Sequence, residues 1–149
     1  MHQELNLAEY ARETDMLVRD LGQIGAGSTV EFLPSVRKIK IRRPRNARPY
    51  DEIVSARVCG DSLMGDYIFD GDRVHCRTNF EMSEITNGRL VVVRLPCGAL
   101  TLKHFYLIDD GEAVKVRLVS ANPAYESREY ELEEIEVKAV VIESVRSWE

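Results

Sequence analysis

The chain has 149 residues, a net charge of −5 at pH 7 and a hydrophobic fraction of 44%. This length fits about one domain, and no apolar run approaches the roughly 18 residues that a membrane-spanning helix needs. Cys59, Cys76 and Cys97 show no metal-ligand spacing and are odd in number, so we expect a cytoplasmic protein without a disulfide framework, a metal ion, a cofactor or a signal peptide.

The N-terminal segment, residues 1–21, has the pattern of a short amphipathic helix. Asn6 is a suitable cap, with Glu9 three residues later. The apolar residues that fall on one helical face are Leu7, Tyr10, Ala11, Leu17, Val18 and Leu21. We interpret the segment as an arm or linker helix, because an independent domain usually needs about 50 residues or more.

Residues 22–36 form a loop region that contains Gly25-Ala26-Gly27. Glycines on both sides of Ala26 let the backbone take an extended or turned form at little steric cost. Considered alone, this tripeptide is most simply a linker.

The stretch from Arg37 to Arg48 is basic and contains no acid. Its charged residues are Arg37, Lys38, Lys40, Arg42, Arg43, Arg45 and Arg48. They indicate either a phosphate-binding strip or a contact for an acidic partner. We favour a third interpretation, a solvated edge strand, because Ile39 and Ile41 alternate with charge and no aromatic residue is interleaved to stack on bases.

A strand predicted from Ile53 to Cys59 leads into a turn that holds Ser62 between Gly60 and Gly65. An exposed nucleophile is expected in such a turn. A serine hydroxyl reacts only when a neighbouring base takes its proton, so the chain must supply that base. Downstream, Asp70-Gly71-Asp72 predicts a tight turn into a strand from Arg73 to Arg77, and we assign its acids no chemistry.

Lys103 is the best candidate for the base. Turn signals divide Arg89 to Val119 into a three-stranded antiparallel meander with Lys103 on the central strand. Side chains alternate across a strand, so Lys103 shares its face with Thr101, Phe105 and Leu107 and not with His104. Burial on this apolar face lowers the pKa of a lysine, and a neutral lysine acts as a general base.

Other nucleophilic arrangements fit less well. A triad would combine Ser62 with His75 or His104 and a turn acid, but His104 points away from the face of Lys103, and His75 is more simply a strand residue. Cys59 and Cys76 stand at strand positions where a packed thiol serves as a small apolar side chain.

The C-terminal part predicts a turn at Asn122-Pro123 and closing strands at Tyr130–Leu132 and Val137–Val145. The acids between Glu126 and Glu136 are expected to form a solvated face, although they also have the charge to attract the basic stretch.

Four segments of the chain together resemble the LexA-like self-cleaving peptidases, which share a β-rich fold with bacterial signal peptidases. Gly60-Asp61-Ser62-Leu63 with Ile68-Phe69-Asp70-Gly71-Asp72 is similar to their serine motif, with Leu63 in place of the usual methionine. Thr101-Leu102-Lys103 resembles their lysine segment, and Leu118 to Tyr125 resembles their Asn-Pro-x-Tyr segment. Gly22 to Gly27 resembles their self-cleavage loop.

The resemblance implies a mostly β fold, with a LexA-like serine/lysine peptidase and dimerisation domain over residues 37–149 and a short helical arm before it. It implies that Ser62 and Lys103 form a catalytic dyad that cuts the chain's own Ala26-Gly27 bond. Backbone N–H groups near Asp61 and Ser62 are the implied oxyanion donors.

The resemblance also implies partners. Relatives form homodimers through C-terminal strands like Val137–Val145, and a RecA filament on single-stranded DNA activates their cleavage after DNA damage. DNA would then be contacted only through a reader domain that this chain lacks. We expect the regulatory domain of a LexA-type or phage-type repressor, with a UmuD-type accessory subunit of a translesion polymerase and a non-cleaving dimerisation or sensing module as alternatives.

Overall fold

The computed structural model describes residues 15–25, 37–60, 66–120, 122 and 124–146. Its strands are β1 (Asp15–Gly25), β2 (Lys38–Arg42), β3 (Ile53–Cys59), β4 (Arg73–Arg77), β5 (Arg89–Arg94), β6 (Leu100–Asp109), β7 (Val114–Val119), β8 (Arg128–Glu131) and β9 (Glu136–Val145). Short 3-10 helices span Met82–Glu84 and Leu132–Glu134. The predicted mostly β fold is therefore confirmed.

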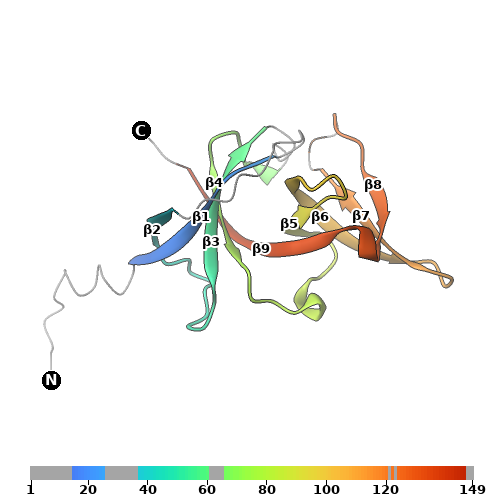
Figure 1. Cartoon of the computed structure of the whole chain (residues 1–149), viewed down its shortest axis with the longest axis horizontal. Helices are drawn as coiled ribbons and strands as arrows, with labels where there is room; N and C mark the ends of the chain where they lie inside the picture. The colour runs from blue at the N-terminus through green and yellow to red at the C-terminus, as the bar shows by residue number, and fades with distance from the viewer. Residues whose placement is uncertain (1–14, 26–36, 61–65, 121, 123, 147–149) are drawn as a thin grey trace, which may run out of the picture.

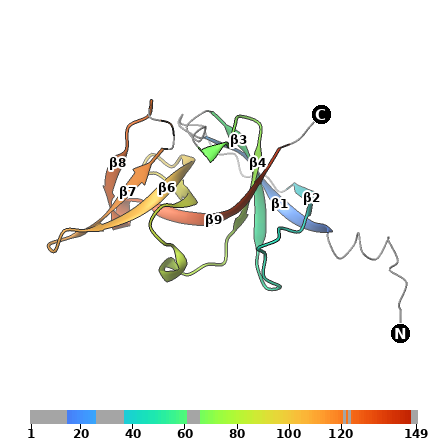
Figure 2. The ribbon, with the colours of Figure 1, turned by 180° about the vertical axis from the view of Figure 1, so that it is seen from behind.

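The strands form one sheet in the order β2-β1-β3-β4-β9-β5-β6-β7-β8. β9 joins its two parts, because it pairs antiparallel with β4 on one side and with β5 on the other. Figures 1 and 2 show this long strand running from the group of β5 to β8 across to the group of β1 to β4. The last position of β1 adds a contact between the groups, since Gly25 pairs with Thr101 of β6.

The largest apolar cluster contains side chains from both groups of strands. Ile24 of β1 and Val58 of β3 belong to the same cluster as Val92 of β5 and Leu102 of β6, and all four side chains are almost fully buried. Burial of one such side chain stabilises the fold by roughly 1.5–3 kcal/mol. This shared core fixes β6 relative to β1 and β3.

The structure corrects the prediction of a helix that continues to Leu21. Residues Asp15–Gly25 form a strand that lies between β2 and β3. The remainder of the predicted arm, residues 1–14, lies outside the described residues. β1 also includes the start of the predicted loop region 22–36, whose remaining residues from 26 onward are not described.

A β-bulge explains why the apolar residues of β1 have a spacing close to that of a helix. The register against β3 shifts between Asp20 and Gln23, and Gly22 takes a φ of 82° there. As a result Val18, Leu21 and Ile24 are all buried at a spacing of three residues. That spacing is close to the helical period, although its cause is an irregular strand.

The other strand predictions agree with the structure. β5, β6 and β7 form the antiparallel meander, with Lys103 on the central strand. The strand predicted at Tyr130–Leu132 is present as β8 but ends at Glu131, because the 3-10 helix begins at Leu132. The acidic residues between Glu126 and Glu136 are all exposed.

β2 is an edge strand, as the favoured interpretation of the basic stretch predicted. Lys38, Lys40 and Arg42 are exposed, whereas Ile39 and Ile41 pack against a small apolar cluster with Val18. In the described residues, no helix has the length and apolar character needed to cross a membrane.

Candidate functional site

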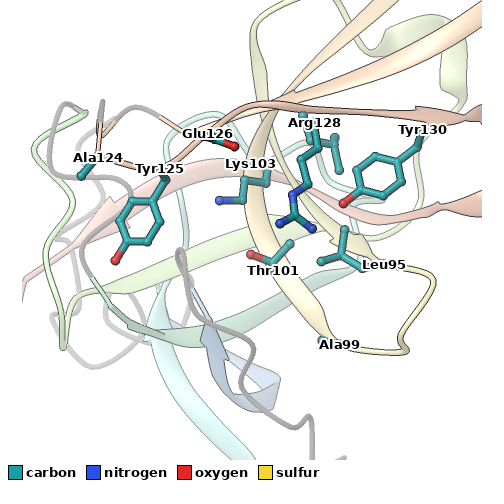
Figure 3. A pocket seen from close by; sticks show the side chains of 10 residues that line it. Leu95, Ala99, Thr101, Lys103, Ala124, Tyr125, Glu126, Arg128 and Tyr130 are labelled. Atoms are coloured by element: carbon teal, nitrogen blue, oxygen red, sulfur yellow. The ribbon is translucent and has the colours of Figure 1, made fainter.

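Lys103 lies on β6 and lines a cavity of about 480 Å³. Thr101 of the same strand also lines it, as the alternation along β6 predicts. Tyr125, Arg128 and Tyr130, which come later in the sequence, complete this part of the lining. Figure 3 shows the Lys103 side chain between Tyr125 and Arg128, above Thr101. The cavity therefore has a potential base at its wall.

Burial lowers the pKa of Lys103 from its ordinary value of 10.5, and the nearby positive charge of Arg128 lowers it further. The ammonium also lies 5.7 Å from the centre of the Tyr125 ring. The lowered pKa increases the fraction of neutral amine at a given pH, which is the form that accepts a proton.

Gly25 reaches the same strand as Lys103. It pairs with Thr101 in parallel register, and the Thr101 hydroxyl donates a buried hydrogen bond of 2.9 Å to the Gly25 carbonyl oxygen. β1 therefore delivers the residue before Ala26 to a point two positions from Lys103. Ala26 and Gly27 themselves lie outside the described residues.

Ser62 belongs to the stretch between Gly60 and Asp66, which we call the serine segment. Both of these flanking residues form hydrogen bonds to other parts of the protein. The backbone N–H of Gly60 donates to Oδ1 of Asp70 at 2.9 Å. At the other end, Oδ2 of Asp66 lies 2.7 Å from Nε2 of His104, the neighbour of Lys103 on β6. Asp61 and Ser62 lie outside the described residues, so the roles predicted for them remain predictions.

The geometry disfavours His104 and His75 as partners of a serine. The two ring nitrogens of His104 already face acceptors, the Asp66 carboxylate and the carbonyl oxygen of Gly88 at 2.7 Å. His75 is buried, and its Nδ1 lies 2.6 Å from Oε1 of Glu143. His104 thus has both ring nitrogens engaged, and it is burial, not the contact with Glu143, that disfavours His75 as the partner of a serine.

Cys76 is a packed thiol, as predicted. It is fully buried in the main core, and burial raises its pKa to about 12. Cys59 is half-buried and Cys97 is exposed. A thiol with such a raised pKa is not a nucleophile near neutral pH.

Sequence reasoning missed three residues of this region. Arg128 received no role, yet its charge acts on Lys103. Tyr125 received no role of its own, yet it lines the cavity, directly after the predicted turn, where its backbone N–H donates to the Asn122 carbonyl oxygen at 3.0 Å. Asp66 received no role, although it joins the serine segment to β6. The Asn-Pro-x-Tyr resemblance was the one available signal, and it pointed to Tyr125.

Comparison with known proteins identifies the family of the chain. The Peptidase S24-like family matches residues 19–142. The chain is 32% identical over 116 residues to a LexA repressor of Exiguobacterium sp. (strain ATCC BAA-1283 / AT1b), covering 78% of this chain and 52% of the relative. It is 30% identical over 122 residues to LexA repressor 2 of Pseudomonas putida, covering 81% and 56%.

A LexA repressor of Zymomonas mobilis is 29% identical over 127 residues, which cover 85% of this chain and 54% of the relative. The chain thus spans about half the length of the curated relatives it matches. The family match extends from β1 into β9 and includes the cavity around Lys103. The chain belongs to the Peptidase S24-like family.

Proposed function

We propose that this chain is the self-cleaving regulatory domain of a LexA-like repressor and that it cuts its own Ala26-Gly27 bond. The observation that carries the proposal is the pairing of Gly25 with Thr101. Because β1 runs parallel to β6 there, the strand is directed along β6 toward Lys103. This direction supports a cleavage site shortly after Gly25, with Lys103 as the base.

In the proposed reaction the Ser62 hydroxyl attacks the carbonyl carbon of Ala26 while neutral Lys103 accepts the hydroxyl proton. Negative charge develops on the carbonyl oxygen, and backbone N–H groups near Asp61 and Ser62 are the proposed donors to it. The C–N bond then breaks as Lys103 returns the proton to the amine of Gly27. Water hydrolyses the Ser62 ester and regenerates the serine.

The half-buried position of Lys103 supports its role. Its lowered pKa, due to burial and to Arg128, supplies the neutral amine without another base. The substrate is intramolecular, so its effective concentration is high and the rate depends on how often the bond is correctly positioned.

The similarity to LexA repressors supports the biological role that we propose. Cleavage after DNA damage would separate a DNA-reading domain from a homodimeric regulatory domain in the cytoplasm. A RecA filament on single-stranded DNA is the proposed activator, acting by binding the form in which the cleavage segment is docked. A helix-turn-helix domain encoded upstream of Met1 is the expected genomic context, whereas its absence would favour a UmuD-type accessory subunit.

The test is incubation of the whole chain from neutral pH up to pH 10.5, the ordinary pKa of lysine, followed by intact-mass measurement. We expect cleavage between Ala26 and Gly27 that accelerates with pH as Lys103 loses its proton. Ser62→Ala and Lys103→Ala should both abolish cleavage. Lys115→Ala, which removes a lysine from an exposed ion pair, should leave the rate unchanged.

An intact wild-type chain at every pH, even with activated RecA filament present, would contradict the proposal. The non-cleaving dimerisation or sensing module would then describe the chain better. Cleavage that persists in Ser62→Ala or Lys103→Ala would retain self-processing but refute the dyad.

A further inference from the structure

The basic stretch, which the proposed reaction does not use, lines a second cavity at the edge of the sheet. This cavity has a volume of about 960 Å³ and is formed by β2, the loop after it, β4 and β9. The basic side chains that line it are Lys40, Arg42, Arg43, Arg45 and Arg73. Basic residues that are distant in sequence therefore lie around one cavity, which we call the edge cavity.

Most of this positive charge is not neutralised by the surrounding protein. Within the described part of the chain, no carboxylate forms an ion pair with Arg42, Arg43 or Arg45. The Arg43 guanidinium donates instead to the carbonyl oxygen of Arg48 at 2.8 Å, which orients it without changing its charge. A locally positive concave surface on a chain of net charge −5 attracts anionic groups.

The other charged side chains of the edge cavity have partners within the protein. Arg73 lies 3.3 Å from Oδ1 of Asp20, and Lys40 lies 3.8 Å from Oδ2 of Asp15. Glu143, the acidic residue of the lining, is 2.6 Å from His75. The arginines of the loop and the end of β2 are thus the groups that are available to an anionic ligand.

The edge cavity also has apolar lining, and this restricts the class of ligand. Ile39, Ile41 and Val145 contribute to the lining, whereas no Phe, Tyr or Trp does and the one ring among the lining residues, that of His75, is buried. Single-stranded nucleic acid binds through stacking on aromatic side chains as well as through phosphate contacts. A ligand that combines carboxylates with aliphatic side chains matches this lining better than a nucleic acid does.

β2 adds a third feature, an available strand edge. It lies at the end of the sheet and, among the described strands, pairs only with β1. Extended peptides bind such edges by main-chain hydrogen bonds, while alternate side chains occupy neighbouring pockets. Arginine suits this arrangement because its planar fork binds a carboxylate through two parallel hydrogen bonds.

We propose that the edge cavity binds an extended peptide segment of a partner protein in which Glu or Asp alternates with apolar residues. The carboxylates contact Arg42 and Arg45, the apolar side chains pack on Ile39 and Ile41, and the peptide backbone pairs with β2. This binding is separate from peptide-bond cleavage and does not depend on Ser62 or Lys103.

The probe is a fluorescent synthetic peptide with the sequence of residues 129–136, in which Glu residues are interspersed with Tyr, Leu and Ile. Its binding to the whole chain is measured by fluorescence anisotropy at low and high salt. We expect saturable binding that weakens with salt and that is lost when every Glu of the peptide is replaced by Gln.

The decisive variant is Arg42→Gln with Arg45→Gln, two exposed substitutions that should leave the fold intact. The dissociation constant should rise by about ten-fold or more, equivalent to about 1.4 kcal/mol. The matched control is Arg94→Gln with Arg117→Gln, which removes the same charge from exposed ion pairs elsewhere and should leave binding unchanged. Circular dichroism confirms that both double variants are folded.

Four outcomes would overturn the proposal. Absence of saturable peptide binding refutes it directly, and an equal loss in both double variants reduces it to a general charge effect. Tighter binding of an oligodeoxythymidine that depends on Arg42 and Arg45 would assign the cavity to nucleic acid. Self-association of the chain that requires the same two arginines would assign it to a second copy.

Discussion

His104 and Asp66 join the strand of Lys103 to the segment that follows Ser62. Their side chains meet at 2.7 Å between Nε2 and Oδ2, and the other ring nitrogen of His104 lies 2.7 Å from the carbonyl oxygen of Gly88. One imidazole therefore connects β6, the turn before β5 and the end of the serine segment.

Breaking this connection should slow self-cleavage. We expect His104→Gln and Asp66→Asn each to reduce the rate by about ten-fold, because either change loosens the serine segment relative to Lys103. The double variant should be no slower than either single variant, since the two residues act through one contact. Intact-mass time courses of the three variants measure this, with exposed Glu112→Gln as the control. Additive losses would mean that the two side chains act separately.

Removal of the Thr101 hydroxyl should uncouple β1 from β6. Thr101→Val keeps the shape of the side chain but leaves the buried Gly25 carbonyl oxygen without its 2.9 Å hydrogen bond. An unsatisfied buried acceptor costs about 1–3 kcal/mol of unfolding free energy. We expect urea denaturation to show a loss in this range and cleavage to slow as well. The control is Thr78→Val, because the hydrogen bonds of the Thr78 hydroxyl, to the carbonyl oxygen and the carboxylate of Glu52, are exposed. This substitution should change neither the unfolding free energy nor the cleavage rate appreciably.

Arg128 should tune the pH dependence of cleavage. Burial and the charge of Arg128 both lower the pKa of Lys103. Arg128→Gln removes the second effect, so the pKa of Lys103 rises and a higher pH is needed to form the neutral base. The midpoint of the pH–rate profile should therefore move to higher pH, with little change in the plateau rate. Arg117→Gln, on the exposed face of β7, should leave the midpoint where it is.

The features of the site that depend on local pattern could be predicted from sequence. Alternation along one strand was enough to put Lys103 on the same face as Thr101 and to turn His104 away. Glycine-containing turns were enough to divide β5, β6 and β7, because tight hairpins have strong sequence preferences. Both inferences involve residues close together in the chain.

Features that depend on distant contacts could not be predicted. The bulge in β1 gave Val18, Leu21 and Ile24 a helical spacing, and only pairing with β2 and β3 shows that the segment is a strand. Likewise, nothing in the sequence next to Asp66 indicates that His104 is its partner. Such pairs follow from the order of strands in the sheet, which periodicity does not specify.

Asp72 and Arg146 should contribute to stability in a pH-dependent way. Burial by itself raises the pKa of Asp72, but hydrogen bonds from Arg146 and from the backbone N–H of Phe69 outweigh it and hold the pKa below the ordinary 3.8. The Asp72 side chain is buried, and Nε of Arg146 lies 3.1 Å from its Oδ1. The folded state therefore favours the ionised carboxylate.

The sign of the effect follows from this lowered pKa. Its stabilising contribution is complete above the ordinary pKa of 3.8 and is lost as pH falls through the lower folded-state value. We expect Arg146→Gln to cost about 1 kcal/mol at neutral pH, since Arg146 is partly exposed and its charge is screened. Because the variant has less of this contribution to lose, its stability should approach that of the wild type as the pH falls below 3.8. Urea denaturation of both proteins across this pH range measures the difference, and a gap that stays constant with pH would show that Arg146 acts through packing on Phe69 and not through the carboxylate.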